Sequence, residues 1–133
     1  MILPDIPEFD LYGVYERGIP NSERIVLKAN QDVEMGSFGL LLGVKTINRV
    51  AQPINNRFFW FGEGIIKAGD WIHIYTSDGK NEKTTLANTD HPVYALYWGF
   101  ETTVLTNELI VPILIRIDGV IVEKIVFSQM AET

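Results

Sequence analysis

The sequence predicts an all-β domain of about eight or nine short strands, folded as a sandwich or a barrel. Short runs of alternating apolar and polar residues recur along the chain between clusters of turn-forming residues. No segment carries a sustained apolar stripe at helical spacing with capping residues at its ends. The 133 residues are 47% hydrophobic, which is enough to fill one core. We therefore expect a single domain over residues 1–133, with flexible ends at about residues 1–7 and 128–133.

The first half of the chain contains four strand-like runs. They cover residues 9–16, 23–30, 38–50 and 57–61. Residues 18–21 (Gly-Ile-Pro-Asn) are a turn signal between the first two runs, and Gly36-Ser37 precedes the third. In the second run Ile25, Leu27 and Ala29 share one face, which predicts a strand.

The second half contains clearer strand signals, over residues 71–76, 93–98, 102–105 and 110–118. In the last run Val111, Ile113 and Ile115 share one face, which we expect to be buried. Pro112 has no N–H group to donate, so this strand is expected at an edge or a bulge of its sheet. Asp118-Gly119 is typical of a two-residue hairpin turn, because glycine accepts a positive φ, and it predicts a return strand over residues 120–127.

Several segments occur in an order and spacing that match one known family. They cover residues 66–76 (Ile-Lys-Ala-Gly-Asp-Trp-Ile-His-Ile-Tyr-Thr), 96–99 (Leu-Tyr-Trp-Gly), 104–108 (Val-Leu-Thr-Asn-Glu) and 116–120 (Arg-Ile-Asp-Gly-Val), with residues 23–29 as a first strand. The pattern resembles the lamin tail domain, an immunoglobulin-like β-sandwich, although Gly36-Ser37-Phe38 stands where that family has a tryptophan. The resemblance implies an antiparallel immunoglobulin-like β-sandwich that serves as a binding or structural module, and it implies no catalytic residues.

The composition argues against several functional classes. Lys and Arg number 11 against 17 Asp and Glu, for a net charge of −6, and phosphate contacts need a cationic surface, so we expect no nucleic-acid partner. Without cysteine the chain has no disulfide scaffold and no Cys-based metal or redox site. The longest apolar run, residues 109–115, is too short for a membrane span, and the first residues lack the pattern of a signal peptide. We expect a soluble protein in the cytoplasm.

Patterns that would support catalysis or metal binding are weak. Ser37 lies between glycines but outside a Gly-x-Ser-x-Gly pattern, and the only histidines are His73 and His91. The turn over residues 78–82 lacks the acidic spacing of a calcium-binding loop. Several carboxylates lie near aromatic residues, but a sequence gives no distance between them, so glycoside hydrolysis ranks behind the non-enzymatic interpretations. We expect no enzyme, no cofactor and no metal site.

Aromatic rows are the strongest indication of function. Three strand-like runs carry aromatic rings at alternate positions, so the rings of each run share one face. Such faces favour contacts with proteins or sugars, because Trp and Tyr bury a large area at low entropic cost. In the run 71–76 the opposite face carries two isoleucines and is the natural core face. The expected binding surface consists of Phe58, Trp60, Trp71, His73, Tyr75, Tyr94 and Trp98.

Three functions fit this pattern, and the sequence leaves them open. The first is a non-enzymatic module that binds a protein partner or assembles with other macromolecules, including copies of itself. The second is a self-assembling structural subunit of a phage or particle, and the third is a carbohydrate-binding module in which Trp and Tyr stack on sugar rings. The same rings are compatible with the rim of a large core, and His73 with either a hydrogen-bonded strand residue or a pH-sensitive contact.

Overall fold

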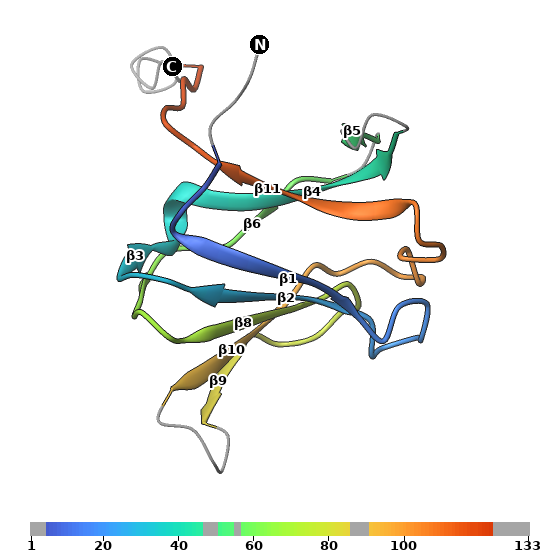
Figure 1. The fold of residues 1–133 in the computed structure, drawn as a ribbon, viewed down its shortest axis with the longest axis horizontal. Helices are drawn as coiled ribbons and strands as arrows, with labels where there is room; N and C mark the ends of the chain where they lie inside the picture. Colours follow the sequence, from blue (N-terminus) through green and yellow to red (C-terminus); the bar gives the residue numbers. More distant parts are fainter. Residues whose placement is uncertain (1–4, 47–50, 55–56, 86–90, 124–133) are drawn as a thin grey trace, which may run out of the picture.

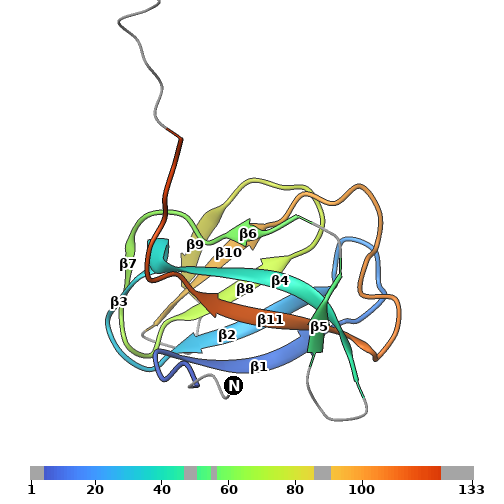
Figure 2. The same cartoon turned by 90° about the horizontal axis from the view of Figure 1, so that it is seen from above.

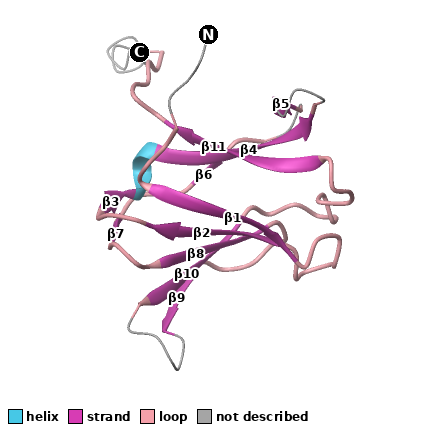
Figure 3. Ribbon diagram, in the orientation of Figure 1, coloured by secondary structure: helices cyan, strands magenta, loops and turns pink. Residues whose placement is uncertain are grey.

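The computed structural model shows an all-β protein with two main sheets (Figure 1). It describes residues 5–46, 51–54, 57–85 and 91–123. The helical structure within these ranges is a three-residue 3₁₀ turn at Met35–Ser37 (Figure 3). The all-β class predicted from the sequence is confirmed.

The larger sheet has five strands in the order β1-β2-β8-β10-β9. They are β1 (Phe9–Tyr15), β2 (Arg24–Ala29), β8 (Trp71–Tyr75), β10 (Pro92–Tyr97) and β9 (Glu82–Thr85). Neighbouring strands are antiparallel except β8 and β10, which are parallel, so the expected fully antiparallel arrangement is wrong for this pair. The difference arises at β9, which pairs antiparallel with the far edge of β10, so the chain returns along β10 in the direction of β8.

The smaller sheet has four strands and is built around β4 (Phe38–Lys45). Its other strands are β11 (Ile110–Arg116), β5 (Ala51–Pro53) and β6 (Phe59–Trp60), all antiparallel to β4, and β3 (Val33–Glu34) and β7 (Ile65–Ile66) form a separate pair. Seen from above, β4 and β11 lie over β1, β2 and β8, so the two main sheets form a sandwich (Figure 2). The described ranges hold eleven strands rather than eight or nine, because several are pairings of only two or three residues.

The core lies between the inner faces of the two main sheets. The five-stranded sheet contributes Ile25, Leu27, Ile72 and Ile74, and β4 contributes Phe38, Leu40 and Leu42. Phe9 of β1 meets Phe38 edge-to-face with ring centroids 4.9 Å apart, and this contact joins the two sheets. Burying each large apolar side chain stabilises the fold by about 1.5–3 kcal/mol relative to leaving it in water.

A buried carboxylate fixes the segment that precedes β11. Glu23 is 1% exposed, and its oxygens accept hydrogen bonds from the backbone N–H groups of Val104 (2.9 Å), Leu105 (3.1 Å) and Gly18 (3.2 Å). The Thr76 hydroxyl donates another. The strand predicted over residues 102–105 is therefore wrong, because the N–H groups of Val104 and Leu105 bind a side chain instead of a neighbouring strand.

β11 turns toward the core the face opposite to the one we expected. Ile110 and Leu114 pack against the core, and the strand register places Leu114 beside Leu40. The face with Ile113 therefore points outward. Both faces of β11 are apolar, so alternation does not choose between them and the register with β4 does. The predicted edge position of Pro112 is confirmed, because β11 is the terminal strand of its sheet.

The hairpin predicted at Asp118-Gly119 is wrong over the described residues. Residues 117–123 form no strand, and the chain leaves the sandwich after β11 (Figure 2). The Ile117 N–H donates to the Ser37 carbonyl (2.6 Å), which carries the backbone past β4 instead of turning it back. Residues 124–127 of the predicted return strand lie outside the described residues. The same holds for residues 1–4 and 128–133 of the ends expected to be flexible, whereas Ile6 packs against the core.

Candidate binding surface

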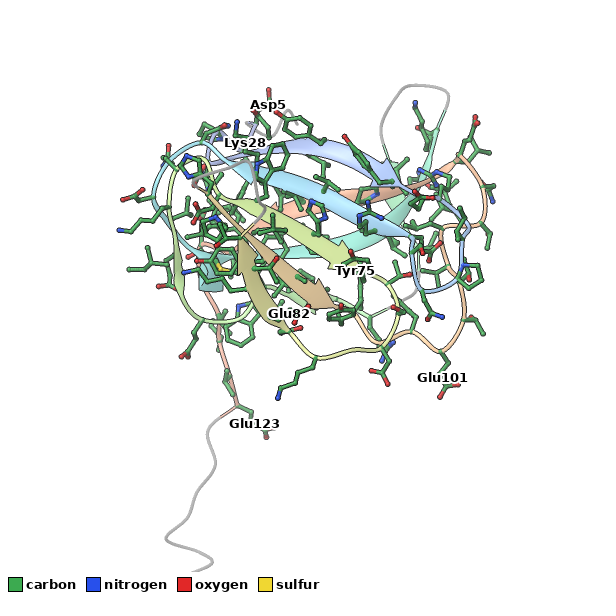
Figure 4. All side chains as sticks on the ribbon, turned by 90° about the horizontal axis from the view of Figure 1, so that it is seen from below. Asp5, Lys28, Tyr75, Glu82, Glu101 and Glu123 are labelled. Carbon is green, nitrogen blue, oxygen red and sulfur yellow. The ribbon has the colours of Figure 1, made fainter. Side chains whose placement is uncertain are left out.

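The outer face of the five-stranded sheet carries the aromatic row predicted on β8. Ile72 and Ile74 are fully buried, whereas Trp71, His73 and Tyr75 project from the opposite side and are half-buried. Figure 4 shows the sheet from this side, with Tyr75 labelled. The row therefore lies at a surface, on a strand whose other face is core.

Four side chains form a row across four strands, which we call the tyrosine row. In register, Tyr15, Arg24, Tyr75 and Tyr97 stand side by side on β1, β2, β8 and β10. The guanidinium carbon of Arg24 lies 6.0 Å from the ring centroid of Tyr15 and 5.7 Å from that of Tyr75. Tyr75 and Tyr97 stack, with centroids 5.1 Å apart and planes at 15°. The Arg24 guanidinium therefore lies between the rings of Tyr15 and Tyr75, and the Tyr97 ring stacks on Tyr75.

A second group, the tryptophan row, stands at the other end of β8. Lys28 Nζ lies 5.3 Å from the Trp71 ring centroid, and the Tyr12 ring meets the Trp71 ring edge-on with centroids 4.9 Å apart. Tyr12 and Tyr15 are three residues apart and would normally point to opposite faces. A β-bulge at Gly13, where φ is +116°, inserts one residue and brings both tyrosines to the outer face.

Smaller side chains separate the two rows. Val26 and Ala95 flank His73 in register and are 2% and 9% exposed, although they belong to the outer face. Burial lowers the pKa of His73 below its usual value, and the nearby Arg24 charge lowers it further. The centre of the surface is therefore apolar and neutral at pH 7. We call the whole surface the aromatic face; it consists of Tyr12, Tyr15, Arg24, Val26, Lys28, Trp71, His73, Tyr75, Ala95 and Tyr97.

The two cations of the aromatic face have no carboxylate partner within the described ranges. Arg24 donates from Nη1 to the Ser22 carbonyl (3.0 Å), and its buried Nε has no hydrogen-bond partner there. Lys28 stands opposite Asp10 in register, but the Asp10 carboxylate accepts a hydrogen bond from Asn30 (3.0 Å) instead. Both positive charges are therefore available to an external anion, on a chain whose net charge is −6.

The second predicted row, on β10, points inward, so its assignment to the binding surface is corrected. The parallel register places Tyr94 beside Ile72 on the core side, and Trp98 is 7% exposed with its ring 5.5 Å from that of Phe59. The outward ring of this strand is Tyr97, which alternates with the predicted Tyr94 and was not among the predicted surface residues. Both faces of β10 are apolar, so the pattern carried no signal for its orientation.

Phe58 and Trp60 lie on the other side of the molecule, on the outer face of the four-stranded sheet. The Phe58 ring covers Gly39, where an added Cβ would lie 2.0 Å from it, and Trp60 Nε1 donates to the Gly36 carbonyl (2.8 Å). The two side chains are 42% and 48% exposed. The predicted site residues are therefore split between two outer faces and the core: Trp71, His73 and Tyr75 share the outer face of the five-stranded sheet, and Phe58 and Trp60 share that of the four-stranded sheet.

The two histidines lie in different parts of the structure. His91 Nδ1 lies 3.2 Å from Asp70 Oδ1, and the other Asp70 oxygen accepts the Lys67 N–H (3.2 Å), so this pair fixes the turn before β8. His73 stands among the rings of the aromatic face. Within the described ranges, no three His, Cys, Asp or Glu residues are grouped as metal ligands. No helix there is long and apolar enough to cross a membrane.

The aromatic face is thus a surface of rings and two half-buried cations, which contact one another within the sheet. Comparison with known protein families, curated proteins and solved structures found no match to this chain. Its function is therefore inferred from the chemistry of this surface.

Proposed function

We propose that the protein is a non-enzymatic interaction module, an immunoglobulin-like β-sandwich of the lamin tail type, that binds a protein partner through the aromatic face. The observation that carries this proposal is the tyrosine row, in which Arg24 is fixed between Tyr15 and Tyr75 and Tyr97 backs the stack. Tyr, Trp and Arg are the residue types that dominate binding energy at protein interfaces. Fixing them before binding lowers the entropic cost of association.

The ring contacts favour a protein partner over a carbohydrate. A sugar stacks on a ring whose face is free, because its C–H groups contact the π-system. Tyr75 has Arg24 on one side and Tyr97 on the other, and Trp71 carries Lys28. A protein segment can instead contact ring edges and hydroxyl groups and use the two cations.

Site-specific photo-crosslinking tests the proposal. A benzophenone amino acid replaces Tyr97 on the aromatic face in one variant and Trp60 on the opposite face in a matched variant. We expect the first variant, in extract of the source cells, to label a discrete partner, and Trp71→Ala introduced into it to abolish the labelling. Circular dichroism checks that each variant is folded. Labelling that is stronger from position 60, or unchanged by Trp71→Ala, would place the interface elsewhere.

Self-assembly is a second candidate, supported by a different part of the chain. Val120, Ile121 and Val122 are 72%, 100% and 75% exposed, and three adjacent aliphatic side chains in water favour association. Light scattering coupled to size-exclusion chromatography tests it. An oligomer that becomes monomeric in the triple Asp variant at positions 120–122 supports a structural subunit, and a monomer at all concentrations contradicts one.

A further inference from the structure

We infer that the aromatic face binds an extended peptide segment with carboxylates at its first and fifth positions and an apolar side chain at the third. The inference rests on the proposed function and adds the chemical class of the partner. It follows from the spacing of the two cations and from what lies between them.

The spacing comes from β2. Arg24, Val26 and Lys28 occupy alternate positions of this strand, so all three project from the outer face. At roughly 3.3 Å per residue, the two cations are rooted about 13 Å apart. In an extended segment, positions one, three and five also share one face and span the same distance. A segment laid along β2 therefore brings one carboxylate to each cation.

The cations are held in place but not neutralised. Arg24 is fixed by Tyr15 and Tyr75, and Lys28 by Trp71, so little side-chain entropy remains to be lost on binding an anion. Two carboxylates of the same sheet, Asp10 and Glu82, make no ion pair with either cation. Asp10 binds Asn30, and Glu82 stands beside Ala95, on the far side of β8 from β2.

The centre between the cations suits an apolar side chain. Val26 and Ala95 present methyl groups on either side of His73, whose pKa is lowered by burial so that its ring is uncharged at pH 7. A charged residue at the third position of the segment would lose its hydration there without gaining a partner.

An acidic protein segment fits this surface better than a single-stranded nucleic acid, which is also a flexible anionic chain. Single-stranded nucleic acids need free ring faces for base stacking and a groove with many cations. Here the ring faces are occupied, the face holds two cations, and the chain as a whole is acidic.

Three peptides of seven residues test the spacing. The first is Ser-Glu-Thr-Leu-Thr-Glu-Ser, the second replaces both Glu by Gln, and the third keeps the charge but places the two Glu side by side. Titrations are followed by NMR, with the indole N–H of Trp71 as the reporter. We expect binding by the first peptide, about tenfold weaker binding by the second because two charge-assisted hydrogen bonds are lost, and an intermediate loss for the third.

Variants of the protein locate the contact. Arg24→Gln and Lys28→Gln are each expected to weaken binding of the first peptide several-fold and to weaken its salt dependence. Lys83→Gln is the matched control, because Lys83 Nζ also lies over a ring, that of Tyr94 at 5.4 Å, but on the opposite face of the same sheet. It is expected to leave binding unchanged.

The alternatives give distinct results. Equal binding of the first and third peptides would overturn the spacing argument, and tighter binding of a thymidine oligonucleotide at the same residues would overturn the choice of a peptide. If none of the peptides binds while Tyr97 still crosslinks a partner, the acidic class is wrong and the proposed function stands. If position 97 gives no crosslink but the first peptide binds as expected, the peptide class stands and the proposed protein partner in the source cells is contradicted.

Discussion

The two outer faces of the sandwich are both rich in apolar residues, but they are built differently. On the four-stranded sheet, side chains cover glycines of the same sheet: Phe58 lies on Gly39, and an added Cβ at Gly43 would meet the end of Ile113 at 2.5 Å. On the five-stranded sheet, rings instead hold the cations Arg24 and Lys28. On the four-stranded sheet, side chains occupy the space above the glycines. On the five-stranded sheet, two cations without carboxylate partners among the described residues remain at the surface. Exposure alone would not have distinguished them.

The largest expected effect comes from the buried Glu23 carboxylate, which joins the residue after β8 to the segment before β11. Glu23→Ala removes the acceptor for the N–H groups of Val104 and Leu105 and for the Thr76 hydroxyl. Leaving these donors without a partner should lower the free energy of unfolding by about 3–4 kcal/mol. Urea unfolding measures the change. Glu23→Gln is the matched control, which keeps one acceptor oxygen and should cost about half as much; equal losses for the two variants would contradict this account.

The next largest effect is expected for Gly43→Ala, which should lower stability without changing binding at the aromatic face. Gly43→Ala places a methyl group 2.8 Å from the backbone oxygen of Gln52, so β5 or β4 must shift. We expect a loss of about 1–3 kcal/mol in unfolding free energy and unchanged crosslinking from position 97. The same substitution at Gly119, where no atom lies within 4 Å of an added Cβ, should leave stability nearly unchanged. A loss of crosslinking in folded Gly43→Ala protein would show that the two faces are coupled.

Trp71→Ala tests whether the aromatic face contributes more to association than to stability. Trp71 is half-buried at a surface, and its removal frees Lys28 and Tyr12 without opening the core. Association should weaken about tenfold or more, as for a hot-spot residue, while the unfolding free energy falls by only about 1–2 kcal/mol. Titration of the labelled partner and urea unfolding give the two numbers. The comparison fails if Trp60→Ala, on the opposite face, weakens association more.

The parts of this structure that could be predicted from the sequence are those with contrast between the two faces of a strand. β8 alternates isoleucine with Trp71, His73 and Tyr75, and its orientation was predicted correctly. β10 and β11 are apolar on both faces, so the side that meets the core depends on partner strands far away in the sequence. The face of β11 with Ile113, predicted to be buried, and the β10 row with Tyr94, predicted to be exposed, are therefore each on the other side.

The remaining differences have a similar cause. β9 is polar and exposed throughout, and it is a strand because it pairs with β10, which no local pattern reveals. Tyr12 and Tyr15 share a face only because of the bulge at Gly13. No local pattern marks Arg24, since its place in the surface depends on rings from three other strands. The glycine within a tyrosine-rich strand was the available signal for the bulge.

The smallest expected effect concerns His73, at the centre of the aromatic face. The pKa of His73 is about 6.5 in the unfolded chain and lower in the folded protein. Between the folded and the unfolded pKa, the unfolded chain binds a proton that the folded chain does not. The stability that neutral His73 contributes is therefore complete above about pH 6.5 and is lost as the pH falls toward the folded pKa. Asp32, whose pKa is lowered mainly by the Ala68 N–H, loses its contribution below pH 3.8, in a separate window.

Urea unfolding of the wild type and of His73→Gln at several pH values between 7 and 5 isolates this effect. The fall in stability with decreasing pH should be shallower in the variant, because Gln takes up no proton, and His91→Gln serves as the control that keeps His73. Covering His73 with a partner removes more of its hydration and disfavours the charged ring further, whereas a partner carboxylate on Arg24 offsets part of the Arg24 charge that lowers the His73 pKa. Binding that weakens below pH 6.5 in the wild type, but not in His73→Gln, would place this histidine inside the interface. Binding that shows the same pH dependence in both proteins would place the interface outside the centre of the aromatic face.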